Sequence, residues 1–104
     1  MKPLLCYITA PNLRESDILG AALVKKKLAS CVMTLPGMRS RYVWQGKVHQ
    51  DKEVLLIVKT FDTKYKKLEA VVKKLHSYEV PCIIAVPIVA GSRQYLAWSK
   101  QVLR

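Results

Sequence analysis

The sequence predicts a single α+β domain of the ferredoxin-like class, a β-α-β-β-α-β sandwich with an additional helix at the C-terminus. Three observations lead to this fold. The chain has 104 residues, the size of one ordinary domain, so we place a single unit over residues 1–104. Hydrophobic residues make up 51% of it, which is enough for one core. Apolar runs with strand character alternate with segments of helical spacing, so two helices would cover one face of a four-stranded antiparallel sheet.

The first two elements are a buried strand and an amphipathic helix. Residues 3–9 (PLLCYIT) are rich in β-branched, aromatic and leucine side chains and are bounded by prolines, which predicts a strand. Asn12 followed by Glu15 resembles a capping box and predicts a helix to about Ala29. The apolar positions that we expect on one face of this helix are Ile18, Ala21, Ala22, Leu28 and Ala29.

The middle of the chain predicts a long β-hairpin. Strands are expected over residues 31–44, interrupted at Pro36-Gly37, and over residues 47–60, with Gly46 supplying the positive φ of a tight turn. Each strand is roughly twice the usual ~5–6 residues. Because such strands would leave long unpaired edges in an isolated small sheet, we expect the chain to form an oligomer.

A second helix, a fourth strand and a short last helix complete the pattern. Asp62 is expected to cap the second helix, and His76 falls at its C-terminal end. Residues 81–89 (PCIIAVPIV) predict the fourth strand, and Gly91-Ser92 begins the last helix. The apolar face of the second helix should consist of Tyr65, Leu68, Val72 and Leu75.

The charge of the chain is strongly positive, with 18 Lys and Arg residues against 7 Asp and Glu, a net charge of +11. Such a charge is typical of nucleic-acid-binding proteins. The lysine runs at 25–27, 66–67 and 73–74 lie within predicted helices, however, where they are expected on the solvated face. The central strand, residues 53–59 (EVLLIVK), lacks the aromatic residues on which RNA-recognition sheets stack bases. We therefore expect no nucleic-acid partner.

Three cysteines, Cys6, Cys31 and Cys82, lie far apart in apolar sequence. Their odd number and their surroundings predict reduced thiols in a reducing compartment, and no C-x-x-C suggests a structural zinc site. The N-terminal apolar run is too short for a secretory signal, and no stretch approaches the ~18 apolar residues of a membrane span. These features predict a cytoplasmic protein without a membrane partner.

The segment 75–84 (LHSYEVPCII) carries the most chemistry, because His76, Tyr78, Glu79 and Cys82 stand within seven positions. They could be metal ligands, a catalytic set or a polar helix-to-strand corner. Thiolates, thioethers and imidazoles suit copper and zinc, so a divalent metal is the candidate cofactor. The available donors, none at a dedicated ligand spacing, are Cys6, Cys31, Cys82, Met33, Met38, His49 and His76.

A catalytic interpretation would use Cys31 or Cys82 as a nucleophile, with His76 or His49 as its base. Such a pair needs an orienting residue and a nucleophile motif, and neither is recognisable in the sequence. We therefore expect that the protein is not an enzyme.

Several short motifs fall together in order along the chain: Leu28-Ala29-x-Cys31, Pro36-Gly37, Tyr42-x-Trp44-x-Gly46-Lys47, Lys59-Thr60, Tyr78-x-x-Pro81 and Tyr95-Leu96-x-Trp98. With the opening YITAPN, they closely resemble the CutA divalent-cation tolerance family over residues 7–103. The resemblance implies a cytosolic homotrimer with a ferredoxin-like subunit, similar in architecture to PII signalling proteins. Bacterial members are linked to tolerance of copper and other divalent metals.

The resemblance also directs attention to particular residues. In copper-binding relatives a first-strand cysteine and histidines before a Pro-Tyr pair are proposed ligands. Here Ile8 stands at the cysteine position, Leu75 precedes His76, Ser77 stands at the proline, and only His76 remains of the histidines. His76 and Cys31 are therefore the candidate metal ligands. The alternative is a PII-like regulator that binds a small molecule between subunits. Candidate residues of that cleft, or of the subunit interface, are Tyr42, Trp44, Lys59, Tyr78, Glu79 and Trp98.

Overall fold

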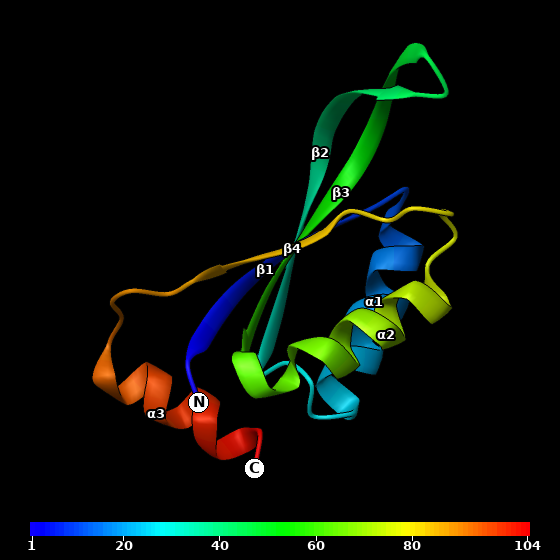
Figure 1. Cartoon of the computed structure of the whole chain (residues 1–104). Coiled ribbons are helices and arrows are strands. Elements are labelled where there is room, and N and C mark those ends of the chain that lie inside the picture. The colour runs from blue at the N-terminus through cyan, green and yellow to red at the C-terminus, as the bar shows by residue number, and fades with distance from the viewer.

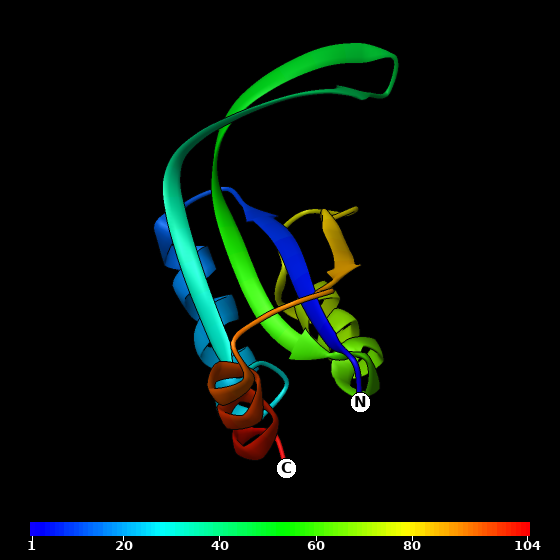
Figure 2. The ribbon, with the colours of Figure 1, turned by 90° about the vertical axis from the view of Figure 1, so that its left-hand side faces the viewer.

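Four strands form one antiparallel sheet in the order β2-β3-β1-β4 in the computed structural model, which describes residues 1–104 (Figure 1). Helices α1 and α2 lie side by side on one face of the sheet, and α3 lies on the other side, near the start of β1 (Figures 1 and 2). This arrangement confirms the predicted β-α-β-β-α-β order with its C-terminal helix. The elements are β1 (Pro3–Ala10), α1 (Leu13–Lys25), β2 (Cys31–Trp44), β3 (Lys47–Phe61), a 3-10 turn (Asp62–Lys64), α2 (Tyr65–Leu75), β4 (Ile83–Pro87) and α3 (Arg93–Val102).

The core lies between the sheet and helices α1 and α2. Alternate residues of the two central strands face the helices, as the period of a strand requires. Burial of each large apolar side chain contributes about 1.5–3 kcal/mol. The main core residues are Cys6, Ile8 and Ala10 of β1, Leu56 and Val58 of β3, Leu19 and Leu23 of α1, and Leu68 and Val72 of α2.

Helix α1 ends at Lys25, so the predicted end at Ala29 is wrong. Lys27 adopts a left-handed conformation (φ 57°), and this turns the chain back toward the helix. The backbone N–H groups of Leu28 and Ala29 then donate to the Leu23 carbonyl, at 2.9 and 3.2 Å. Leu28 and Ala29 are buried as predicted, but they belong to the turn after the helix and not to the helix itself.

The predicted apolar face of α1 is also partly wrong. Its buried residues are Ser16, Leu19 and Leu23, whereas Ile18 and Ala21 are exposed. Ser16 fits this face because its hydroxyl donates to the Leu13 carbonyl at 2.7 Å, which satisfies a polar group inside the protein.

The sequence predicted that Asp62 caps α2, and this is wrong. Asp62 instead begins the 3-10 turn that precedes the helix. Its carboxylate accepts a hydrogen bond from the backbone N–H of Lys2 at 2.8 Å, and its own N–H donates to the Lys2 carbonyl. Asp62 therefore ties the end of β3 to the start of the chain. The predicted apolar face of α2 is confirmed at Leu68 and Val72, which are buried. Tyr65 is half-buried, but Leu75 is 41% exposed, so the prediction is wrong at the last turn of the helix.

The fourth strand is shorter than residues 81–89, because β4 covers only Ile83–Pro87. It pairs with β1 alone, from Ile8 opposite Ile83 to Leu4 opposite Pro87. The last helix begins as predicted, since the Ser92 hydroxyl accepts a hydrogen bond from the Tyr95 N–H at 3.3 Å.

The sheet face that α1 and α2 leave uncovered is apolar, and we call it the open face. The strand register brings its residues side by side, for example Met33 opposite Ile57 and Tyr7 opposite Ile84. Ile84 and Leu35 are 54% and 52% exposed. The members of the open face are Leu5, Tyr7, Met33, Leu35, Leu55, Ile57, Ile84 and Val86.

The β2–β3 hairpin extends beyond the sheet and bends over its end (Figure 2). Gln45 and Gly46 form its turn with positive φ values of 52° and 77°, as in a type I′ turn. A bulge between Leu35 and Met38 shifts the register of β2, as the interruption at Pro36-Gly37 predicted, with Gly37 at φ 86°. Both termini lie at the end of the molecule away from the hairpin turn (Figures 1 and 2). None of the helices is long and apolar enough to cross a membrane.

Candidate functional site

A cleft of about 700 Å³ opens between the hairpin and the corner that joins α2 to β4, and we call it the hairpin cleft. Figure 2 shows the hairpin curving toward this corner. The cleft brings together residues far apart in the sequence, from β1, both hairpin strands and the corner. Its lining consists of Thr9, Ser40, Arg41, Tyr42, Trp44, Glu53, Ser77, Tyr78, Glu79, Val80, Pro81 and Cys82.

Glu53 is the buried acid of the hairpin cleft, with 7% of its surface exposed. The Tyr78 hydroxyl donates to its Oε2 at 2.9 Å, which joins the corner to β3. Burial and then the nearby Glu53 carboxylate raise the pKa of Tyr78 well above its usual value of 10.0. Tyr78 therefore stays protonated and remains a hydrogen-bond donor at neutral pH.

A second tyrosine–carboxylate pair lies higher on the hairpin. The Tyr42 hydroxyl donates to Asp51, and this bond is the main cause of the raised pKa of Tyr42. The Tyr42 ring stacks on the His49 ring, with centroids 5.5 Å apart. Asp51 and Glu53 are two residues apart on β3, so both project from the same face of the strand.

Cys82 lines the cleft beside these acids. Burial, followed by the charge of Glu53, raises the pKa of its thiol above 9.0. The thiol is therefore largely protonated at neutral pH, and it is a weaker nucleophile than a free cysteine.

His76 stabilises the corner between α2 and β4 and is not part of the cleft lining. Its ring Nε2 donates to the Thr9 carbonyl at 2.7 Å, and its Nδ1 accepts from the Tyr78 N–H at 3.0 Å. Because a backbone N–H can only donate, Nδ1 carries no proton and the ring is neutral. The contact of Nδ1 with Glu15 Oε2 at 3.3 Å is therefore not an ion pair. Glu15 instead accepts the Ser77 N–H at 3.1 Å, and so it holds the same corner.

Lys59 and Trp98 do not line the hairpin cleft, in contrast to the expectation that they would share it with Tyr42 and Trp44. The Lys59 ammonium donates to the Tyr95 hydroxyl of α3 at 2.9 Å, and the Tyr95 ring lies 5.5 Å from the Trp98 ring. These contacts dock α3 at the far end of the sheet. The hairpin cleft does contain the other four expected residues, Tyr42, Trp44, Tyr78 and Glu79.

Cys31 and His76 lie at opposite ends of the sheet within one chain. Cys31 pairs with Lys59, which pairs with Leu5 near the start of β1, whereas His76 contacts Thr9 near its end. No group of three or more His, Cys, Asp or Glu side chains in the chain could hold a metal ion.

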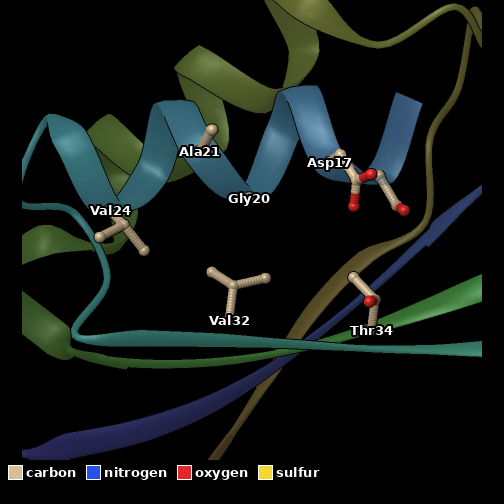
Figure 3. Close-up of a pocket in the computed structure, with 7 residues that line it drawn as sticks. Asp17, Gly20, Ala21, Val24, Val32 and Thr34 are labelled. Atoms are coloured by element: carbon tan, nitrogen blue, oxygen red, sulfur yellow. The ribbon is translucent and has the colours of Figure 1, made fainter. Parts of the chain in front are cut away.

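A smaller hollow of about 290 Å³ lies between α1 and β2 (Figure 3). Its centre is Gly20, where an added Cβ would come within 3.2 Å of Val32 Cγ1. Asp17 is its one charged residue, and no aromatic or basic side chain lines it. This hollow follows from the close approach of α1 to β2, and it offers little polar chemistry to a ligand.

Glu53, the most buried ionisable residue of the hairpin cleft, was not predicted from the sequence as a site residue. One signal was present, because Glu53 stands directly before the apolar run Val54–Val58, where a charge is out of place in a buried strand. Its partner Tyr78 is 25 positions away, so nothing local indicated the contact.

The fold and the cleft define a class: a small ferredoxin-like protein with an extended hairpin, an apolar open face and a ligand-sized hollow beside the hairpin. The chain belongs to the family described as CutA1 divalent ion tolerance protein, whose family model matches residues 4–102. This match confirms the resemblance found in the sequence.

Named relatives agree with the family. The chain is 46% identical to the divalent-cation tolerance protein CutA of Thermus thermophilus over 94 residues, which cover 90% of this chain and 91% of the relative. It is 44% identical to the chloroplastic CutA protein of Arabidopsis thaliana over 94% of this chain, but it spans only 54% of that plant protein.

Solved structures share the fold. The Cut A1 protein from Thermus thermophilus superposes with a TM-score of 0.91 at 44% identity, over 93% of this chain and 94% of the other. CutA1 from Oryza sativa superposes with a TM-score of 0.96 at 40% identity, over 100% of this chain and 95% of the other.

Proposed function

We propose that the chain acts in the cytoplasm as a divalent-cation tolerance protein, a non-catalytic homotrimer that binds copper or zinc between its subunits. Its family supports the tolerance role, since relatives from Thermus thermophilus and Archaeoglobus fulgidus are named divalent-cation tolerance proteins. Neither nucleic acid nor a membrane is among the partners that we propose.

The open face is the observation that carries the assembly. It presents exposed Met33, Leu35, Ile84 and Val86 with no helix over them, and contiguous apolar patches of this kind mark interaction sites. The edge strands β2 and β4 also leave backbone groups free to pair with another chain. Copies of the same chain would cover both features, and the resemblance to the trimeric family favours three.

The metal sites would lie between subunits, because the donors within one chain are too far apart. Cys31 is half-buried on β2, the edge strand that also carries Met33 and Leu35 of the open face, so a neighbouring chain can approach it. His76 would first have to release Thr9 or Tyr78 before it could bind a metal. A catalytic cysteine would need a histidine base within hydrogen-bond reach of its thiol. The two hydrogen bonds of the His76 ring go to Thr9 and Tyr78 instead, which supports a non-catalytic role.

Light scattering and titration calorimetry test this function together. A mass near three times 11.8 kDa is expected at micromolar concentration, with binding of Cu²⁺ or Zn²⁺ that weakens in Cys31→Ala. Cys82→Ala is the matched control, because Cys82 lies in the hairpin cleft instead. A stable monomer, or a trimer that binds neither metal, would contradict the proposal.

A second candidate function is that of a PII-like regulator with a small-molecule ligand in the cleft. The hairpin cleft favours it, since a volume of about 700 Å³ lies within the usual range of ligand pockets, roughly 300–1,000 Å³. Binding of a metabolite or nucleotide panel, in a protein that is silent toward metals, would place this function first.

A further inference from the structure

Glu53 in the hairpin cleft is a buried carboxylate without a cationic partner. It is 7% exposed, and its one hydrogen bond comes from the neutral Tyr78 hydroxyl. The ion pair of the chain, Lys73–Glu69, lies elsewhere, on α2. An ionised carboxylate has about four lone-pair positions, and a buried charge is costly unless it is paired. One charge of the cleft is therefore uncompensated in a chain with 18 basic residues.

The surroundings of Glu53 add negative charge. Glu79 also lines the cleft, and Asp51 accepts a hydrogen bond from the lining residue Tyr42, so three of the seven acidic residues of the chain lie in or next to the cleft. Arg41 is the one basic residue of the lining, and its Nε donates across the hairpin to Gln50 at 3.1 Å. The cleft is thus an acidic site in a protein of net charge +11.

The walls of the cleft are aromatic. Tyr42 and Trp44 come from the hairpin, and Tyr78 comes from the opposite corner. Aromatic faces attract cations electrostatically, and this attraction is strongest where water is excluded. A buried carboxylate in a cleft that is also lined by aromatic rings is a combination that recognises ammonium or guanidinium groups.

We propose that the hairpin cleft binds a small organic cation, an amine or guanidinium carried on an apolar or aromatic body. The charged group pairs with Glu53, and the body packs against Trp44, Tyr42 and Tyr78. A bare metal ion fits less well, because it would fill little of the 700 Å³ and would find no group of three ligands. The proposal rests on the second candidate function above and names the ligand class of that cleft.

Phenethylamine is a suitable probe, with 2-phenylethanol and phenylacetate as neutral and anionic isosteres of the same size. Calorimetry on the intact protein should give a Kd of about 1 mM or tighter for the amine, a reasonable affinity for so small a ligand. The isosteres should bind at least about ten-fold more weakly, because they cannot pair with Glu53.

Two variants and a control link this binding to the cleft. Glu53→Gln keeps the shape and one acceptor oxygen, and it should weaken amine binding about ten-fold or more. Trp44→Ala, at a partly exposed hairpin position, should weaken it several-fold even if Glu53→Gln folds poorly. Glu69→Gln removes an exposed carboxylate of α2 and should leave amine binding unchanged.

Equal binding of the three isosteres would overturn the proposal, as would unchanged affinity in Glu53→Gln or the absence of amine binding at about 10 mM, far above the expected Kd. A basic residue from a neighbouring subunit could neutralise Glu53 instead; the amine would then not bind, and Glu53→Gln would weaken the assembly. If the amine does not bind but a nucleotide does bind in the cleft, the proposed ligand class is wrong, while the PII-like function is still supported. If the protein is a monomer that binds the amine but no metal, the proposed metal-binding trimer is wrong, while the inference about the cleft is supported.

Discussion

His76 holds the corner beside the cleft through two hydrogen bonds inside the protein. Replacing it with alanine would leave the Thr9 carbonyl and the Tyr78 N–H without partners and would open a cavity. We expect His76→Ala to lower the free energy of unfolding by about 2–4 kcal/mol, measured by urea denaturation. The exposed neighbour Ser77→Ala should have little effect. If His76→Ala instead kept its stability and lost copper binding, His76 would be a ligand and not a corner.

Asp62 should make the free energy of unfolding depend on pH in the acid range. The Lys2 N–H donates to its carboxylate and lowers its pKa below the ordinary value of 3.8. Since the folded pKa lies below the unfolded one, the bond contributes stability above the unfolded value, and the contribution is lost as pH falls through the folded value. The stability difference between the protein and Asp62→Asn should therefore shrink as the pH of urea unfolding is lowered from 6 to 3, values that bracket an ordinary Asp pKa of about 4. An equal difference at both pH values would exclude this role.

Cys6 should be the least reactive thiol in the folded protein. It is fully buried, and burial raises the pKa of its thiol to about 11. Very few Cys6 thiols are therefore ionised at pH 8, so iodoacetamide should not alkylate Cys6 until the protein unfolds. Mass spectrometry after brief labelling, with exposed Cys82 as the comparison, checks this. Rapid native labelling of Cys6 would show that β1 opens.

At the residue scale, the sequence could identify the parts of the site that stand near one another in the chain. Tyr78 and Glu79 belong to one short segment, and Tyr42 and Trp44 to one strand. Glu53 was missed because its burial depends on Tyr78, which reaches it only after the chain has folded. Lys59 and Trp98 lie at the other end of the sheet within one chain, so their expected place in a cleft or interface between subunits stays a prediction.

Among the elements, the hairpin turn is under local strain that one substitution can relieve. Gln45 has a φ of 52°, a left-handed conformation that asparagine tolerates better. Gln45→Asn should therefore raise the free energy of unfolding by about 0.5 kcal/mol in urea denaturation. Gln50→Asn, in the regular part of β3, is the control and should be neutral or destabilising. Destabilisation by Gln45→Asn would mean that the glutamine side chain itself supports the turn.

The elements themselves were predictable to different degrees. The hairpin strands and β1 followed from apolar runs and turn residues, and their bounds were confirmed within a residue. The end of α1 was not predictable, because Lys27 takes the left-handed position that usually calls for glycine. The start of α2 was missed for another reason: Asp62 has the character of a helix cap, but its partner is Lys2, sixty positions away.

For the whole molecule, the two faces of the sheet should respond differently to the same charge. Ile84→Asp places a carboxylate on the exposed open face, and it should reduce the mass in light scattering while the circular dichroism spectrum stays folded. Val58→Asp places the same charge in the core and should unfold the protein. If Ile84→Asp leaves the assembly intact, the open face is not where the subunits meet.

The position of the two termini has a practical consequence for binding measurements. Both chain ends lie away from the hairpin turn (Figures 1 and 2). The hairpin cleft is lined in part by residues of that hairpin. A biotin or histidine tag at either end would therefore hold each subunit on a sensor surface with the cleft directed into the flowing sample. Small cationic probes could then be screened on the tethered protein without the linker blocking their entry.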